Sequence, residues 1–344
     1  MMIQENITQH KKNKCKWWLL GALIVILIIY NAFWYFASQF VQNKLVDFLA
    51  RGQKSNSVIA CENIGKAGFP LRVGVRCDNF NFRQTLSGIE LNTHNLKATA
   101  PIYALKWASV TVASPASIKL PNLLSIDADW KELEISGDID KPIPNKISLI
   151  SEDLILKTKH LSKQDTPLLS ANFLRFEADN LRNNLNIQLF FDKVHLPFTL
   201  PKTNTPFPAV EGMARIQLND TSDIFNNKLK RIADIRERLY GHSGMVERAE
   251  IALETGGKMT INGPYAIDEM GYIDADLDIA VGDINALSLS IKQMFPSEGK
   301  NIDTIVFIIN SMPKNKQGEP VLKVSIKKGE AKLGYVKIGN IAPL

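Results

Sequence analysis

Two cysteines have the spacing that offers the clearest chemistry in this chain. Cys61 and Cys77 flank a strand-like stretch within residues 60–80, ACENIGKAGFPLRVGVRCDNF, and the third cysteine, Cys15, lies far upstream. Such a pair can be reactive, bind a metal or form a disulfide, and the compartment in which the chain folds decides which. No Cys-x-x-Cys or His-x-x-x-His spacing supports a metal site, and the five histidines are scattered: His10, His94, His160, His195 and His242.

An aspartate cluster is better explained by local structure than by metal binding. Asp274, Asp276 and Asp278 are spaced like the start of a calcium loop. That loop needs glycine at its sixth position and glutamate at its twelfth, where this chain has Ile279 and Asn285. The aspartates also alternate with apolar residues, so we read this stretch as a half-exposed strand.

The sequence lacks the common catalytic motifs. His242 and Ser243 lie in GHSGM, which has no strand-to-helix elbow context and is read as a turn. Glycine-rich nucleotide-binding motifs and the His-Glu-x-x-His zinc motif do not occur. We therefore predict no catalytic, cofactor-binding or metal-binding residue and no enzymatic activity. A hydrolase on an unfamiliar fold is the enzymatic alternative.

The charge distribution argues against nucleic acid as a partner. The 344 residues carry a formal net charge of +6, and half of it lies within residues 1–16, where Lys11, Lys12, Lys14 and Lys16 outnumber Glu5. The remaining surplus of +3 is too small to make a phosphate-binding face. With 45% hydrophobic and 22% charged residues, most of the chain is expected to fold.

An apolar segment near the start predicts a membrane anchor. Residues 17–37 contain no charged side chain, and at about 1.5 Å per residue they span roughly 30 Å, the thickness of a bilayer core. Aromatic residues stand at both ends, as is typical of the two membrane interfaces. A cleaved signal peptide is the alternative, but its apolar core would be shorter and its end would carry small residues.

The anchor sets the expected topology. The preceding lysines favour a basic cytoplasmic tail over residues 1–16, a single transmembrane helix over 17–37, and a main domain outside the cytoplasm. Residues 38–54 follow as a helix that is either a stalk packed on the domain or an interfacial helix along the headgroups. We expect the inner membrane, with residues 55–344 forming one β-rich periplasmic domain.

Export of the domain would place Cys61 and Cys77 in an oxidising compartment, where an even pair is expected to form a disulfide. Closing a loop of this size contributes about 3 kcal/mol on the chain-entropy model. Cys77 falls on the apolar side of the alternating strand LRVGVRCD, opposite Arg72 and Arg76. These arginines either belong to a solvated strand face or line a polar site. Cys15, beside the anchor, is expected to be a free thiol, with acylation as the alternative.

The rest of the chain repeats a period-two pattern that predicts an antiparallel meander with one apolar side. Glycine, proline, asparagine and aspartate punctuate the runs, and the last one turns at Lys328-Gly329. Amphipathic helices are expected over 221–241 and 283–295, whereas 301–313 is ambiguous between helix and buried strand. The predicted fold class is α+β: a transmembrane helix, then a β-rich, mainly antiparallel curved sheet with a few amphipathic helices. The apolar positions of five runs are Leu124, Ile126, Ala128 and Trp130; Leu154 and Leu156; Leu174, Phe176 and Ala178; Leu185, Ile187, Leu189 and Phe191; and Ala214, Ile216 and Leu218.

Three stretches together give the chain a family resemblance. They are GFPLRVGVRCDNF, which follows the anchor, GGKMTINGPYAID, and the terminal KKGEAKLGYVKIGNIAPL. The chain resembles an uncharacterised family of Gram-negative envelope proteins, domain of unknown function 2125, over most of residues 55–344. That resemblance implies no activity, cofactor or site residue. A looser architectural similarity to AsmA-like inner-membrane proteins, associated with phospholipid transport or outer-membrane homeostasis, implies a role in the envelope.

The expected function follows from the anchor and the one-sided strands. If the sheet is closed or covered, its apolar side is simply a core. If it stays open, that side is a groove able to hold acyl chains. We expect a non-enzymatic protein that binds lipid or another hydrophobic ligand in envelope maintenance, without a cofactor. The alternative is a scaffold that docks another envelope protein through a strand edge or the stalk helix.

Overall fold

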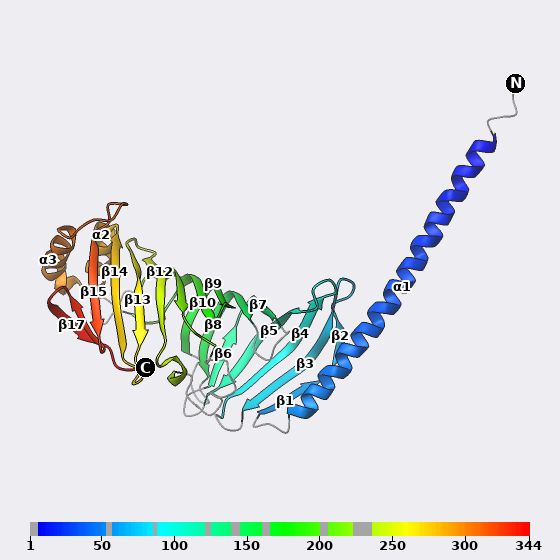
Figure 1. Ribbon diagram of the computed structural model, residues 1–344, viewed down its shortest axis with the longest axis horizontal. Coiled ribbons are helices and arrows are strands. Elements are labelled where there is room, and N and C mark those ends of the chain that lie inside the picture. The colour runs from blue at the N-terminus through cyan, green and yellow to red at the C-terminus, as the bar shows by residue number, and fades with distance from the viewer. Residues whose placement is uncertain are drawn as a thin grey trace.

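The computed structural model describes residues 6–52, 57–84, 88–120, 125–138, 145–159, 166–199, 206–222 and 236–344. One long N-terminal helix, α1 (Asn6–Gly52), leads into a single 17-stranded sheet, with a few short helices near the far end (Figure 1). This arrangement confirms the predicted α+β class, with an apolar N-terminal helix followed by a large antiparallel sheet.

Helix α1 is long and apolar enough to cross a membrane. Its stretch Trp17–Asn43 contains an 18-residue window with a mean hydropathy of 2.2, and the side chains of that window are not buried by the rest of the protein. The predicted transmembrane and stalk segments, 17–37 and 38–54, lie in this one continuous helix as far as Gly52. Asn31, the strongly polar residue within the apolar run, donates from Nδ2 to the carbonyl of Leu27 one turn earlier, at 2.7 Å.

The strands form an antiparallel meander. From β7 onward each strand pairs with the next, β5 pairs with both β6 and β7, and β1 and β2 both pair with β3. The first strands are β1 (Ser57–Glu62), β2 (Gly65–Ala67), β3 (Arg72–Gln84), β4 (Glu90–Pro101), β5 (Trp107–Lys119), β6 (Ser125–Asp129), β7 (Glu132–Asp138), β8 (Lys146–Lys159) and β9 (Thr166–Leu181). The others are β10 (Asn184–Val194), β11 (Val210–Leu218), β12 (Ser243–Leu253), β13 (Lys258–Ile267), β14 (Ile273–Gly282), β15 (Val321–Lys327), β16 (Glu330–Leu333) and β17 (Val336–Asn340).

Tight turns set the register where the chain supplies the required residues. Lys328 and Gly329 have φ values of 48° and 76°, and they join β15 to β16 as the sequence predicted. Arg182 and Asn183, at 52° and 66°, join β9 to β10 in the same way. Two successive positive φ values are the hairpin geometry that matches the right-handed twist of the flanking strands.

The later helices are α2 (Ile284–Met294), α3 (Gly299–Asn310) and the 3-10 turns η2 (Glu237–Leu239) and η3 (Pro296–Glu298). Asp283 caps α2 by accepting a hydrogen bond from the backbone nitrogen of Ala286 at 3.1 Å, which confirms the helix predicted over 283–295. The ambiguous stretch 301–313 is helical in α3. Most of the helix predicted over 221–241 lies outside the described residues.

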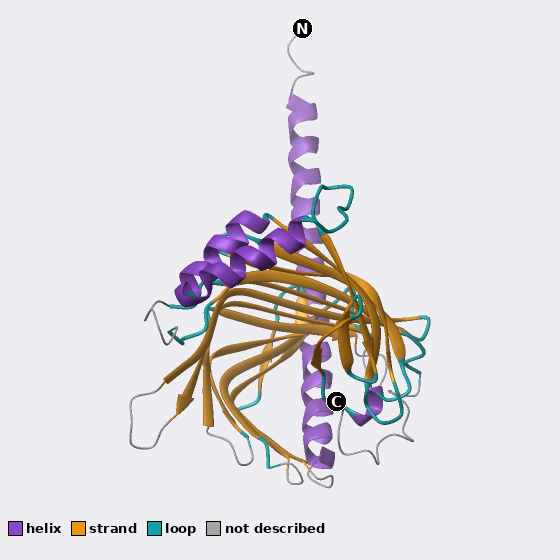
Figure 2. Ribbon diagram, turned by 90° about the vertical axis from the view of Figure 1, so that its left-hand side faces the viewer, coloured by secondary structure: helices purple, strands orange, loops and turns teal. Residues whose placement is uncertain are grey.

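The sheet is strongly curved. Viewed along its long axis it resembles a trough, with α2 and α3 on its outer side (Figure 2). The accessible surface of the chain is 23238 Å², whereas a compact monomer of 38.5 kDa would expose about 14,000 Å². The protruding helix and a sheet without a second sheet packed over it both account for the excess.

The register brings the predicted apolar positions to one side of the sheet, here called the apolar face. Ala178 pairs with Ile147 and Ile187, and Ile187 pairs in turn with Ile216, so apolar positions from four strands align across the sheet. On the other side, Arg76 pairs with Lys97, which pairs with Thr111, and we call this side the polar face. The strand pairing thus confirms what the alternation in the sequence predicted, a sheet with two chemically different sides.

Two small clusters of buried residues lie on the apolar face. Near the middle of the chain, Trp130 packs with Ala116 and Ala128, and its indole nitrogen donates to the carbonyl of Val112 at 2.8 Å. Near the end, Ala275 packs with Val324, Ile326 and Ala331. Between them, apolar side chains stay partly in solvent: Ile135 is 37% exposed and Ile251 is 42% exposed. The apolar face is therefore not a closed, dry core along its whole length.

Candidate hydrophobic binding site

An apolar pocket of about 380 Å³ lies between helix α1 and the first strands of the sheet. The helix contributes one side of its surface over residues 33–41, and the strands contribute small residues of β3, β4 and β5. One lining residue is polar, Thr99, whose hydroxyl accepts a hydrogen bond from Arg72 on the polar face. The lining residues are Phe33, Ala37, Phe40, Val41, Val73, Gly74, Val75, Ala98, Thr99, Ala100, Ile102, Leu105 and Ala108.

Small side chains create this space. Where β3 and β4 pair, Val75 stands opposite Ala98 and Val73 stands opposite Ala100, so the β4 side presents only methyl groups toward the helix. Gly74 stands opposite Thr99, and a Cβ atom at this position would lie 2.0 Å from the carbonyl oxygen of Ala98. The two strands therefore approach closely only because residue 74 has no side chain.

Polar contacts along α1 fix the helix on the sheet. The indole nitrogen of Trp34 donates to the carbonyl of Arg72 at 2.7 Å, and its ring meets that of Phe69 edge-on, with centroids 5.1 Å apart. Tyr30 donates from its hydroxyl to the carbonyl of Pro70. Farther along, the ammonium group of Lys66 lies 3.4 Å from the centroid of the Tyr35 ring, a cation–π contact. The helix is thus held at several successive turns, which gives the pocket a defined wall.

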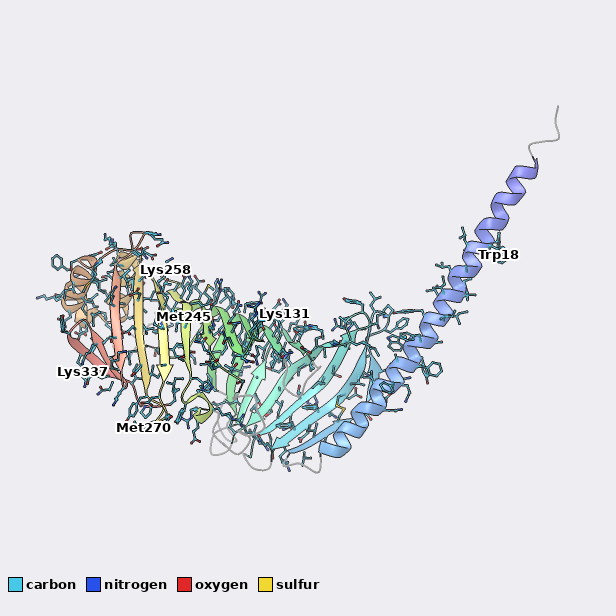
Figure 3. All side chains as sticks on the ribbon, viewed as in Figure 1. Trp18, Lys131, Met245, Lys258, Met270 and Lys337 are labelled. Atoms are coloured by element: carbon cyan, nitrogen blue, oxygen red, sulfur yellow. A yellow bond between two sulfur atoms is a disulfide. The ribbon has the colours of Figure 1, made fainter. Side chains whose placement is uncertain are left out.

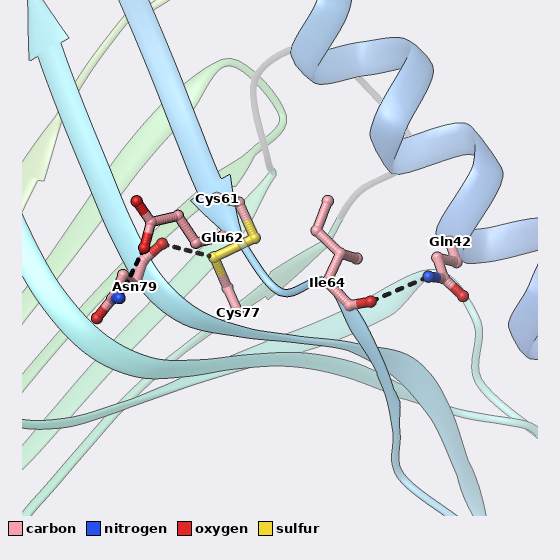
Figure 4. Close-up of a disulfide and its surroundings, with 6 residues drawn as sticks. All are labelled: Gln42, Cys61, Glu62, Ile64, Cys77 and Asn79. Atoms are coloured by element: carbon pink, nitrogen blue, oxygen red, sulfur yellow. Dashed lines mark hydrogen bonds between the residues drawn. A yellow bond between two sulfur atoms is a disulfide. The ribbon is translucent and has the colours of Figure 1, made fainter.

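Two cysteines whose sulfur atoms are at disulfide-bonding distance lie close to the same junction (Figure 4). The Sγ atoms of Cys61 in β1 and Cys77 in β3 are 2.11 Å apart, with their Cα atoms 5.6 Å apart, as the expected bridge requires. Next to them, the Nε2 of Gln42 in α1 donates to the carbonyl of Ile64 at 3.1 Å. The bond and this contact together tie the chain that leaves the helix to the strand that forms the pocket floor.

The pocket opens onto a continuous apolar row. Starting at Val75 and Ala98, each member stands directly opposite the next on the neighbouring strand, across eleven strand pairs, and every member is apolar. The row is Val75, Ala98, Val110, Ile135, Leu149, Phe176, Leu189, Ala214, Ala249, Ile261, Ile279 and Leu322. A parallel row alongside it carries Ala108, Gly137, Ile147, Ala178, Ile187, Ile216, Val246 and Gly263.

The two arginines of β3 lie on the polar face and behave differently from each other. Arg72 is half-buried: its Nε donates to the hydroxyl of Thr99 at 2.9 Å, and its Nη2 donates to the hydroxyl of Ser109. Arg76 is exposed and lies over Gly65. The solvated-face interpretation therefore holds for Arg76 only, because Arg72 is engaged with its neighbouring strands.

The positions examined for catalysis and metal binding lie in ordinary structural settings. His242 follows η2 in a turn, where its Nδ1 lies 3.0 Å from the carbonyl oxygen of Tyr240, and Ser243 begins β12. The three aspartates of DADLD lie in β14, as the strand interpretation predicted. Within the part of the chain that the structure describes, no group of three or more metal-binding side chains is found.

Ionisable groups with shifted pKa values lie away from the pocket. Burial raises the pKa of Tyr265, whose hydroxyl donates to the carbonyl of Gln217 at 3.2 Å. A hydrogen bond from Arg248, 2.5 Å from the carboxylate, lowers the pKa of Glu250. These shifts reflect burial and ion pairing within the sheet, and neither Tyr265 nor Glu250 lines the pocket.

One of the two interpretations of residues 38–54, a stalk packed on the domain, already includes Phe40 and Val41, but the sequence analysis missed the contribution of Phe33 and Ala37 in the predicted anchor. Phe33, Ala37 and Val41 recur at intervals of four residues, so they lie on one side of the helix. In the sequence this stripe is hidden, since an anchor is apolar all round. Gly74 in the alternating strand is a sequence signal for the close approach of β3 and β4, but it does not identify the helix that packs on them.

Comparison with known proteins agrees with the resemblance seen in the sequence. A search of curated proteins finds no match to this chain. The family model described as "Uncharacterized protein conserved in bacteria (DUF2125)" matches residues 34–342, which include three of the four pocket-lining residues of α1 and the whole sheet. The chain therefore belongs to the DUF2125 family.

Proposed function

We propose that this protein is a single-pass membrane protein whose pocket holds the acyl chain of a lipid, in the maintenance of the bacterial envelope. The observation that carries the proposal is the apolar pocket of about 380 Å³ between α1 and β3–β5. A pocket lined almost entirely by hydrocarbon selects an apolar ligand, because burying a polar group there without a partner would be unfavourable.

The apolar row supports an extended ligand rather than a small compact one. It starts at two pocket-lining residues, Val75 and Ala98, and continues strand by strand to Leu322. Helix α1 packs on the apolar face and is visible through the open centre of the trough in Figure 2, so this face lines the inside. An acyl chain that leaves the pocket would remain on apolar surface along the trough.

The proposed topology places the short basic tail in the cytoplasm, α1 in the inner membrane and the sheet in the periplasm. The lysines before Trp17 and the Cys61–Cys77 pair both support it, since disulfides persist outside the cytoplasm. Alkaline phosphatase fused after Leu344 should be active, because that enzyme matures only outside the cytoplasm. A fusion that is made but inactive would overturn the topology.

Photocrosslinking tests lipid binding directly. The full chain is placed in membranes that contain a phospholipid with a photoreactive diazirine in its acyl chain, then irradiated and mapped by peptide mass spectrometry. We expect adducts on the pocket-lining residues 73–75 and 98–100 in addition to those on α1. Adducts on residues 17–32 of α1 without any on residues 73–75 and 98–100 would show a helix in contact with the bilayer and no lipid in the pocket.

A second candidate function is a scaffold for another envelope protein. Strand β17 pairs on one side with β16, and the structure gives no strand partner for its other side among the described residues. Tyr335, Val336 and Ile338 are well exposed there, so an extended segment of a partner could add to this edge. Crosslinking in cells followed by purification should then yield one stoichiometric protein partner, which disappears when Ile338 is replaced by proline.

A further inference from the structure

We propose that two loops of the sheet domain, Gly68–Leu71 and Ile102–Leu105, insert into the leaflet of the membrane that faces the domain. The partner surface is thus the bilayer spanned by α1. The inference rests on that membrane span from the proposed function, but not on lipid binding in the pocket.

The contacts of α1 determine the depth of the first loop. Tyr30 donates to the carbonyl of Pro70, and Trp34 packs against Phe69 while donating to the carbonyl of Arg72 at 2.7 Å. The β2–β3 turn is therefore fixed beside helix residues 30–34, near the middle of the helix in Figure 1. Tyr30 and Trp34 follow Trp17 by 13 and 17 residues, which at 1.5 Å per residue is about 20 Å and about 26 Å.

These distances from Trp17 place the first loop inside the bilayer. If the hydrocarbon core begins near Trp17, directly after the lysines, it extends about 30 Å and ends near residue 37. The loop at residues 30–34 then lies roughly 4–10 Å below the far boundary of the core. A helix tilt of about 20° shortens the distances from Trp17 along the bilayer normal by about 6%, which places the loop roughly 6–11 Å below the far boundary.

Moving the helix to free the loop would be costly. A span that ended at Ile29 would need about 20 residues and so would begin near His10. It would draw Lys11, Lys12, Lys14 and Lys16 into the hydrocarbon core, where charged side chains are strongly unfavourable. The helix contacts and the lysines together leave insertion of the loop as the favoured arrangement.

The loops have the composition that such insertion needs. Residues 68–71 are Gly-Phe-Pro-Leu and residues 102–105 are Ile-Tyr-Ala-Leu, without a charge. Ile102 donates its backbone N–H to the carbonyl of Leu71 at 3.1 Å, so the two loops form one apolar tip. Leu71 is 62% exposed and Tyr103 is 83% exposed, which is an unfavourable arrangement in water and a favourable one among lipid tails and headgroups.

Charged groups near the tip are compatible with this position. Lys66 lies over the ring of Tyr35, one residue beyond Trp34 and thus toward the headgroups. Arg72 is bonded to Thr99 and Ser109 on the neighbouring strands, and Lys106 follows directly after the second loop. A cation next to an inserted apolar tip matches the phosphate layer of the leaflet.

Depth-dependent quenching tests the inference on the full chain. In a Cys15→Ser background with Cys61–Cys77 oxidised, Tyr103→Cys and Leu71→Cys are labelled with the fluorophore NBD. The protein is reconstituted into phosphatidylethanolamine–phosphatidylglycerol vesicles. Ile26→Cys in α1 serves as the buried reference. Met270→Cys, in the β13–β14 turn far from α1 and 64% exposed, serves as the aqueous reference (Figure 3).

The expected result is that doxyl-labelled lipid quenches the NBD at positions 103 and 71, while iodide quenches it at least fivefold less than at position 270. Labels at 103 and 71 as open to iodide as that at 270, with the label at 26 shielded, would overturn the loop insertion alone. An iodide-accessible label at 26 would overturn the membrane span and the loop insertion with it. Shielded loops in a protein without lipid adducts in its pocket would support this inference and refute acyl-chain binding.

Discussion

Filling the pocket with one side chain should remove bound lipid. Ala98 belongs to β4 and lines the pocket on the side opposite α1. Its partner on the neighbouring strand β3 is Val75, which also lines the pocket. Replacing Ala98 with phenylalanine adds six carbon atoms at the pocket wall. Lys97→Phe is the matched control, because Lys97 is the preceding residue of the same strand, is exposed and points to the polar face, where it pairs with Arg76 and Thr111.

The magnitude follows from the pocket volume. A methylene group takes about the space of a water molecule in the liquid, roughly 30 Å³, so the pocket of about 380 Å³ holds about a dozen. Six added carbon atoms remove about half of these positions. At about 0.8 kcal/mol per buried methylene, the chain loses roughly 5 kcal/mol of transfer free energy relative to water. Even about 1.4 kcal/mol of net loss lowers lipid affinity tenfold, so we expect at least a tenfold reduction in retained lipid.

Native mass spectrometry of the full chain, released from detergent micelles, measures the retained lipid as adducts of phospholipid mass. Circular dichroism and the intact Cys61–Cys77 bond report that each variant is folded. The reasoning would be refuted if A98F retained as much lipid as the parent chain. Equal loss in A98F and K97F would also refute it, because the effect would then not depend on the face of the strand.

Three further predictions concern stability. Replacing Cys61 and Cys77 together with serine should lower the free energy of unfolding by about 3 kcal/mol, seen as an earlier urea midpoint, and a reducing agent should shift the parent chain equally but not the variant. Trp34→Phe keeps the ring but loses the indole hydrogen bond to a β3 carbonyl at 2.7 Å, so thermal unfolding should show a loss of about 1 kcal/mol; no change would argue that α1 is not held there. The pKa of Glu250 is lowered by Arg248, so its contribution is present above the unfolded pKa and disappears as pH falls through the folded one. Glu250→Gln should therefore cost up to about 1 kcal/mol at pH 7 and nothing in strong acid, measured by urea titration at both pH values; an equal cost at both would refute the ion pair as the cause.

The sequence by itself determined the local organisation of this protein. A charge-free run of anchor length indicates an apolar helix, and alternation with period two indicates a strand with two unlike sides. Apolar positions such as Ile187 and Ile216 were therefore assigned to one side before their pairing was known. Turn chemistry at Lys328-Gly329 and the cap at Asp283 were equally local, since each depends on residues a few positions apart.

Only the tertiary structure decided what the apolar side does. Pairing alone does not tell whether a one-sided sheet closes on itself, and its curvature and partly exposed face depend on the twist accumulated over many strands. The pocket arises because Trp34 and Tyr30 fix one particular side of α1 against Val73 and Val75, although the anchor is apolar all round. Such long-range contacts join residues about 40 positions apart, and no local pattern encodes which of many equivalent apolar surfaces will meet.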